Sequence, residues 1–259
     1  MMFSLVVRPI LFVFVLMSAG CTDDYIGDLV DQDDEPNPPS GEVSSEVPAV
    51  FQAFAGRADV TLDGDYVVIR SNGVPDHGSP YFESSDTRYE AYDGTNADFH
   101  LNPNRIASQD LVFRIPVTPR ASSSPQSTPM GPMGVSLNGV PFYNQYAAGS
   151  APLTREINSF DQYNGHPQQF GGYHYHIEPL YLTETYGRDA LLGYLLDGFP
   201  VYGPVENGRE VGNGDLDAYH GHTHATAEYP EGIYHYHVTA EDPYINGAGF
   251  YGVAGTVSQ

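Results

Sequence analysis

The stretch GGYHYHIEP at residues 171–179 recurs, with small changes, as EGIYHYHVT at residues 231–239. In an extended strand, alternate side chains point to the same face. His174 and His176 are therefore expected to project to one face, with Tyr173 and Tyr175 on the other. The same alternation holds over residues 234–237. Both copies are thus predicted to be β-strands that carry a pair of imidazoles.

The two tetrads belong to a longer internal repeat. SLNGVPFYN (136–144) matches LLDGFPVYG (195–203), and NGH (164–166) matches HGH (220–222). The offsets of 59, 56 and 61 residues are similar but unequal, as expected when turns between equivalent strands differ in length. We therefore predict two related β halves, roughly 134–179 and 193–239, that face each other across a pseudo-twofold axis.

The composition also favours β structure. The chain has 20 Tyr, 28 Gly, 21 Pro and no Trp among its 259 residues, which suits short strands joined by tight turns. We predict a mostly β protein with few or no long helices, in which residues 49–259 form a single domain. The charge is strongly acidic, with 33 Asp and Glu against ten Arg and a net charge of −23. Nucleic acid is excluded as a partner because its phosphates would be repelled.

The first 21 residues are typical of a bacterial lipoprotein signal. Arg8 precedes the apolar run ILFVFVLM, and SAGC then ends at Cys21, the only cysteine of the chain. We expect cleavage before Cys21, lipidation of its thiol and anchoring to a membrane. Residue 22, directly after the lipidated cysteine, is Thr and not Asp, which favours anchoring to the outer membrane, with the protein facing the periplasm or the cell surface. An ordinary secretory signal and a short transmembrane anchor are the alternatives.

Residues 22–48 carry nine acidic residues together with Pro, Ser and Gly. Such a segment has too little apolar surface to fold alone, so we predict a flexible acidic tether.

Histidine is the residue type that points to chemistry. Two imidazoles on one strand face can converge on a metal ion, and His174, His176, His235 and His237 are the predicted ligands. His166 and His222 are candidate further ligands, because each lies in the repeated Gly-His pair. Imidazoles without thiolate favour copper, zinc or nickel over calcium or magnesium. Copper is favoured by affinity and zinc by geometry or supply.

Other residues are candidates around such a site. Glu178, Asp197 and Glu228 are possible acceptors for the imidazole N–H groups, and Tyr202 is expected to line the site. Asp197 and Glu228 are also the candidate catalytic carboxylates. The alternative without metal is a polar core in which His and Tyr bond to each other and to backbone carbonyls.

Four segments resemble the YHYH-domain protein family, which is named for the tetrad. They are NPNRIASQDLVFRIPVTP (102–119), GVSLNGVPFYN (134–144), LLGYLLDGFPVYGP (191–204) and EYPEGIYHYHVT (228–239). The resemblance covers roughly residues 60–259. It implies a bacterial, secreted protein and no particular activity.

Three functions are compatible with these observations. The first is a cell-envelope lipoprotein that binds a transition metal through two His-x-His strands for sequestration, sensing or delivery. The second is a metal-dependent extracellular enzyme, either a hydrolase or a copper redox enzyme. The third is a metal-free structural or adhesion module. Whether the two tetrads form one site or two is left open by the sequence.

Overall fold

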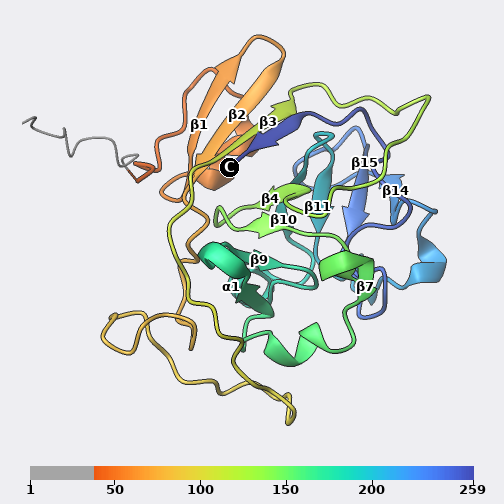
Figure 1. The fold of residues 1–259 in the computed structure, drawn as a ribbon. Helices are drawn as coiled ribbons and strands as arrows, with labels where there is room; N and C mark the ends of the chain where they lie inside the picture. Colours follow the sequence, from red (N-terminus) through yellow and green to blue (C-terminus); the bar gives the residue numbers. More distant parts are fainter. Residues whose placement is uncertain (1–37) are drawn as a thin grey trace, which may run out of the picture. The chain divides into compact units, whose positions relative to one another are not determined.

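The computed structural model describes residues 38–259, which belong to one compact unit (Figure 1). The predicted signal and lipidated Cys21, and the tether up to residue 37, lie outside the described residues. The described part is mostly β structure, as predicted, and its one α-helix is α1 (Leu180–Tyr186). The short 3₁₀ helices are η1 (Ala49–Phe54), η2 (Ala148–Ser150), η3 (Glu156–Ser159), η4 (Gln169–Gly171) and η5 (Asn213–Asp215). Within residues 38–259, no helix combines the length and the apolar character that crossing a bilayer requires.

A four-stranded sheet forms the first layer, in the order β1-β2-β3-β16. Its strands are β1 (Asp59–Asp63), β2 (Tyr66–Ser71), β3 (Leu111–Pro116) and β16 (Thr256–Ser258), all antiparallel to their neighbours. Leu111, Phe113 and Ile115 alternate along β3 and are buried, which is the pattern of a strand with one face on the core.

An eight-stranded sheet carries the two tetrads, in the order β14-β15-β11-β10-β4-β5-β9-β8. Its strands are β4 (Gly134–Ser136), β5 (Pro141–Phe142), β8 (Gly165–Pro167), β9 (Tyr173–Tyr175), β10 (Leu191–Leu195), β11 (Pro200–Tyr202), β14 (Gly221–His224) and β15 (Ile233–His237). Two small hairpins pair β6 (Tyr146–Ala147) with β7 (Ala151–Pro152) and β12 (Val205–Glu206) with β13 (Arg209–Glu210).

The pairing pattern of this sheet is the same outward from its centre in both directions. The central strands β4 and β10 are antiparallel. Each is followed by an antiparallel neighbour, then a parallel tetrad strand, then an antiparallel edge strand. As Figure 1 shows, β9 and β15 therefore lie on opposite sides of the central pair. The predicted rotation axis between the halves stays a prediction.

One hydrophobic core joins the two sheets. It includes Ile69 and Phe113 from the first sheet and Val135 and Tyr194 from the second. Phe51 of η1 stacks on Tyr194 with ring centroids 4.6 Å apart. Because both sheets bury apolar faces in the same core, the eight-stranded sheet has a rigid support on which to hold its polar residues.

The folded domain includes residues before position 49, where the sequence analysis placed its start. Val43 bridges to Val60 of β1, Val47 is buried, and Asp59 accepts hydrogen bonds from the Gly41 and Glu42 backbone. Residues 38–48 therefore pack against the first sheet instead of belonging to the tether, because two valines within the acidic segment find apolar partners.

Candidate metal centres

A tight turn delivers the third histidine of each half. In the first half, Asp161 Oδ1 accepts hydrogen bonds from Tyr163 N (3.0 Å) and Gly165 N (3.2 Å), and His166 follows. A larger residue does not fit in place of Gly165, because its Cβ would lie 2.3 Å from the Tyr173 hydroxyl. This turn leads into β8, and the chain then reverses at residues 168–172 so that His166 of β8 lies directly opposite His174 of β9. Cross-strand partners share a face of the sheet, so these imidazoles meet.

The second half contains the same turn. Asp217 Oδ1 accepts from Tyr219 N (2.9 Å) and Gly221 N (3.3 Å), and His222 lies opposite His235 in the β14–β15 pair. Each half thus assembles three histidines from one hairpin, two from the tetrad strand and one from its neighbour.

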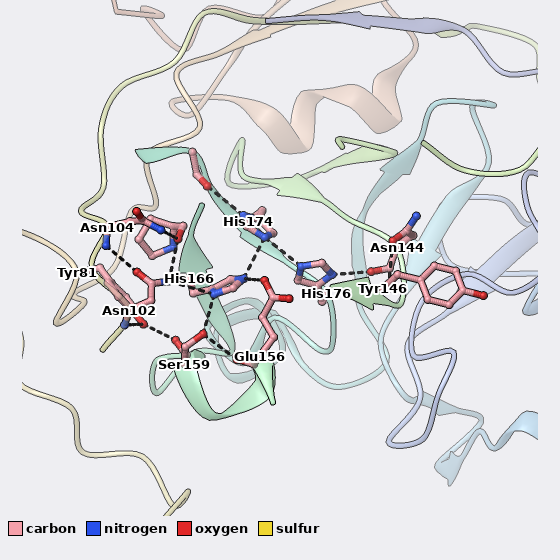
Figure 2. A network of polar contacts seen from close by, with 12 residues as sticks. Tyr81, Asn102, Asn104, Asn144, Tyr146, Glu156, Ser159, His166, His174 and His176 are labelled. Atoms are coloured by element: carbon pink, nitrogen blue, oxygen red, sulfur yellow. Dashed lines mark hydrogen bonds and ion pairs between the residues drawn. The ribbon is translucent and has the colours of Figure 1, made fainter. Parts of the chain in front are cut away.

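The first cluster consists of Glu156, His166, His174 and His176, whose ligand atoms all lie within 4.8 Å of one another (Figure 2). His174 Nε2 lies 3.1 Å from His166 Nε2 and 3.0 Å from His176 Nε2. Glu156 Oε1 lies 3.3 Å from His166 Nε2. Three imidazole nitrogens and one carboxylate oxygen, all of them atoms that can ligate a metal, therefore lie close together.

The opposite ring nitrogens decide where the protons lie. His174 Nδ1 donates to the Gly172 carbonyl (3.0 Å), and His176 Nδ1 donates to the Asn144 carbonyl (2.5 Å). A carbonyl oxygen only accepts, so both Nδ1 atoms must carry the hydrogen. His166 Nδ1 donates to Ser159 Oγ (2.9 Å), because the Ser159 hydroxyl already gives its own hydrogen to the Glu156 carbonyl.

This arrangement directs the three Nε2 lone pairs at one another, and His174 Nε2 lies 3.1 Å and 3.0 Å from the other two nitrogens. Burial lowers the pKa of His166 to about 3 and that of His176 to about 4, and holds the pKa of His174 well below its usual range. A proton between the rings is thus disfavoured at neutral pH. A divalent cation removes the lone-pair repulsion, and neutral imidazoles oriented through Nδ1 are its usual ligands. The residues present fit a transition-metal ion.

The second cluster, Glu206, His222, His235 and His237, has the same composition. Glu206 Oε1 lies 3.5 Å from Nε2 of both His222 and His235. The Nε2 atoms of all three histidines are buried without a hydrogen-bond partner among the described residues. His235 Nδ1 donates to the Ile233 carbonyl (3.0 Å) and His237 Nδ1 to the Gly203 carbonyl (2.7 Å). These carbonyls occupy the positions that Gly172 and Asn144 occupy in the first half, so the orienting contacts recur.

Burial lowers the pKa of all three histidines in the second cluster, that of His237 to about 4. Burial alone would raise the pKa of Glu206, but the hydrogen bond from His224 and the nearby imidazoles lower it. The second cluster is therefore also a set of neutral imidazoles beside a carboxylate. The structure contains two separate clusters at the two ends of one sheet, and either can hold a metal ion.

The four tetrad tyrosines lie on the other face, as the alternation predicts, and each hydroxyl has a polar partner. Tyr173 donates to Asp161 (2.8 Å) and Tyr234 to Asp217 (2.9 Å), so the turn aspartates also hold the tetrad strands. Tyr236 donates to Asp197 (2.6 Å). Tyr175 lies 3.0 Å from His77 Nε2.

The structure places the other predicted residues as follows. Tyr202 lies beside the second cluster, with its ring centroid 5.1 Å from that of His235. Its hydroxyl donates to Glu228 (2.8 Å), so the Tyr202 side chain lies between Glu228 and the histidines. Asp197 is not brought to either cluster, because it bonds Tyr236 on the opposite face of β15. Glu178 is not brought to either cluster, since its Oε1 lies 3.7 Å from Arg188 Nε.

Two further histidines of the HGHTH segment have distinct positions. His220 occupies the left-handed position of the Asp217 turn (φ 76°), where the first half has Asn164, and its Nε2 contacts Thr239 Oγ1 at 2.9 Å. His224 has a half-exposed side chain (54%) and lies 2.9 Å from Glu206 Oε2. His220 is therefore a turn residue, whereas His224 borders the second cluster.

The sequence analysis did not predict that Glu156 and Glu206 belong to the clusters. Glu156 stands 18 residues before His174 and Glu206 stands 29 residues before His235, so the internal repeat does not relate them. The turn residues Asp161 and Asp217 could have been found from the sequence, because the pattern Asp-x-Tyr-x-Gly-His occurs at 161–166 and again at 217–222.

A cavity of about 400 Å³ adjoins the second cluster and is lined in part by Tyr202, Glu206, Glu228, His235 and His237. The second cluster therefore borders a cavity of small-molecule size, although the side chains of His235 and His237 are themselves buried.

The Asp197→Asn variant is expected to change the pH dependence of stability. Burial raises the pKa of Asp197 from 3.8 to about 6, so the folded protein holds this proton above the pH at which the unfolded chain releases it. The wild type then loses about 2 kcal/mol of unfolding free energy at this site as the pH rises from 4 to 7, and the variant does not. Urea denaturation of both proteins across this pH range measures the difference in unfolding free energy between them. The contributions of the other titrating groups cancel in this difference. A stability difference that is constant with pH would contradict the shift.

Comparison with known protein families gives a match. The family model described as YHYH protein matches residues 112–210 and 205–249, which include both tetrads and cover more than half of the chain. No curated protein and no solved structure matches significantly. The chain belongs to the YHYH protein family.

Proposed function

We propose that this protein binds two transition-metal ions, one in each cluster of three histidines and a glutamate. The observation that supports the proposal is the orientation of six imidazoles. Five donate Nδ1 hydrogens to a carbonyl or hydroxyl oxygen, and in both clusters the Nε2 atoms converge beside a carboxylate. A polar core without metal would pair these nitrogens with donors, because buried unpaired polar atoms are costly.

The ligand set favours copper or zinc. Three neutral imidazoles and one carboxylate suit borderline divalent ions, among which copper binds most tightly and zinc accepts four-coordinate geometry readily. The absence of a thiolate from the clusters argues against a soft ion such as Cu(I).

The proposed location is the bacterial cell envelope, with the protein held by lipid on Cys21. The lipoprotein-like sequence of residues 1–21 supports this location. A net charge of −23 attracts cations to the protein, which suits sequestration or delivery of metal at the envelope.

Metal analysis tests the proposal directly. The full chain, purified in detergent without a histidine tag and dialysed after loading with Zn²⁺, is expected to retain two ions. His174→Ala/His176→Ala and His235→Ala/His237→Ala are each expected to retain one. The matched control is His220→Asn, which removes another buried histidine and introduces the residue that the first half has at this turn position. It is expected to retain two ions.

Each variant is checked for folding by circular dichroism. Retention of no zinc, copper or nickel by the folded wild type would refute the proposal and favour the metal-free structural module. Equal metal loss in the His220→Asn control would show that binding is not specific to the clusters.

A metal-dependent enzyme is the second candidate function. The cavity beside the second cluster supports it, because an enzyme needs room for a substrate next to the metal. Of the two candidate catalytic carboxylates, Glu228 borders this cavity, whereas Asp197 bonds Tyr236 on the opposite face of β15.

A further inference from the structure

The two clusters differ in their surroundings. In the first, Tyr143 stacks over the His174 ring at 4.0 Å, and Phe160 lies parallel to His176 at 5.7 Å. In the second, Tyr202 meets His235 edge-on instead of covering it, and the cavity opens beside the rings. A ligand approaching from this cavity can come close to the second metal position.

One wall of the cavity belongs to the second cluster. His235 and His237 line it, both are almost completely buried, and their Nε2 atoms have no hydrogen-bond partner among the described residues. The Tyr202 ring leads from these histidines to Glu228, whose carboxylate accepts the Tyr202 hydroxyl. The cavity is therefore bordered both by the proposed metal position and by a separate carboxylate, and the Tyr202 side chain contacts both.

The remaining lining gives the cavity its charge and its width. Asp189 and Glu228 are carboxylates outside the metal cluster, and no Lys or Arg is present among the described lining residues. Ala190, Ala225 and Ala227 also line the cavity, and none has a side chain larger than a methyl group. The cavity thus has room for a short hydrocarbon or aromatic stem and favours a positive charge at its far end.

We propose that the second metal centre binds a small amine-bearing ligand in this cavity, with a donor atom of the ligand at the metal and its ammonium group against Glu228. This inference rests on the proposed function, because it requires a metal ion in the second cluster.

Three pyridines that differ only in the small substituent at position 4 test the proposal on protein loaded with Co²⁺. All three present a ring nitrogen to the metal, and they differ in the group at the opposite end. These are 4-(aminomethyl)pyridine, which is cationic, 4-methylpyridine, which is neutral, and pyridine-4-carboxylate, which is anionic. The visible d–d bands of Co²⁺ report coordination. We expect saturable changes, with the cationic probe bound about fivefold more tightly than the neutral one and the anion most weakly.

Two variants of equal charge locate the ammonium contact. Glu228→Gln is expected to abolish the preference for the cationic probe while still accepting the Tyr202 hydroxyl. Glu231→Gln, an exposed position three residues away, is expected to keep the preference. The His235→Ala/His237→Ala variant, which retains the first ion, is expected to show no spectral change with any probe.

The outcomes separate the two proposals. Cobalt content is measured in each sample before titration. A wild type that holds no more cobalt than His235→Ala/His237→Ala has no ion in the second cluster, which would refute the proposed function for that cluster and this inference with it. Two ions without any spectral response would overturn the ligand site alone. Equal binding of the three probes, or an unchanged preference in Glu228→Gln, would overturn the amine assignment.

Discussion

The Asp161→Ala variant is expected to lose about 4 kcal/mol of unfolding free energy, measured by chemical denaturation of the metal-free protein. Asp161 is buried and accepts hydrogen bonds from the hydroxyls of Ser79 (2.6 Å) and Tyr173 (2.8 Å), in addition to two turn amides. Each buried donor left unpaired costs about 1–3 kcal/mol. Ser79 and Tyr173 are fully buried, so water does not replace the lost carboxylate easily.

Asp217→Ala is the matched comparison in the other half. Asp217 holds the same turn and the equivalent tyrosine, Tyr234, but it is exposed, so water can satisfy the donors that the substitution frees. A loss of only about 1 kcal/mol is expected there. Asp161→Asn should recover part of the stability because it keeps one acceptor oxygen. Equal losses in Asp161→Ala and Asp217→Ala would show that burial of the carboxylate is not the cause.

Metal is expected to stabilise the fold by a comparable amount. A ligand that binds only the folded state contributes about 4 kcal/mol when its free concentration is 1,000 times its dissociation constant. Each cluster links residues from separate segments, such as Glu156 of η3 with the β8–β9 hairpin, so the unfolded chain cannot reproduce it. We therefore expect Zn²⁺-saturated protein to unfold at much higher denaturant concentration than protein in excess chelator.

The difference between metal and chelator is compared within each variant, so that the intrinsic cost of a substitution cancels. His174→Ala/His176→Ala and His235→Ala/His237→Ala should each keep the stabilisation of one ion. His220→Asn should keep the full difference. An undiminished metal effect in a variant without either pair of tetrad histidines would mean that the ion stabilises the protein elsewhere, and would contradict the assignment of that cluster.

Several parts of the site could be predicted from local sequence. The alternation of His and Tyr predicts that the imidazoles of one tetrad share a strand face, because side-chain direction in a strand depends only on the neighbouring residues. The repeated Gly-His pair identified His166 and His222 by analogy between the halves, and both lie in the clusters. The same reasoning could not place Asp197, because a carboxylate near a strand end can serve either face of the sheet. Its bond to Tyr236 puts it with the tyrosines.

The sequence by itself determined the mostly β class, the two His-x-His strands and the separation of imidazoles from tyrosines, because these follow from residue type and a period of two. Only the tertiary structure decided that the tetrads form two clusters instead of one. The central pair of β4 and β10 places β9 and β15 on opposite sides of the sheet, and this order depends on long-range strand pairing. It also decided that Glu156 and Glu206 complete the clusters, since each arrives from a separate segment whose spacing to the tetrad differs between the halves. The cavity beside the second cluster likewise depends on how loops distant in the chain pack, which no local pattern encodes.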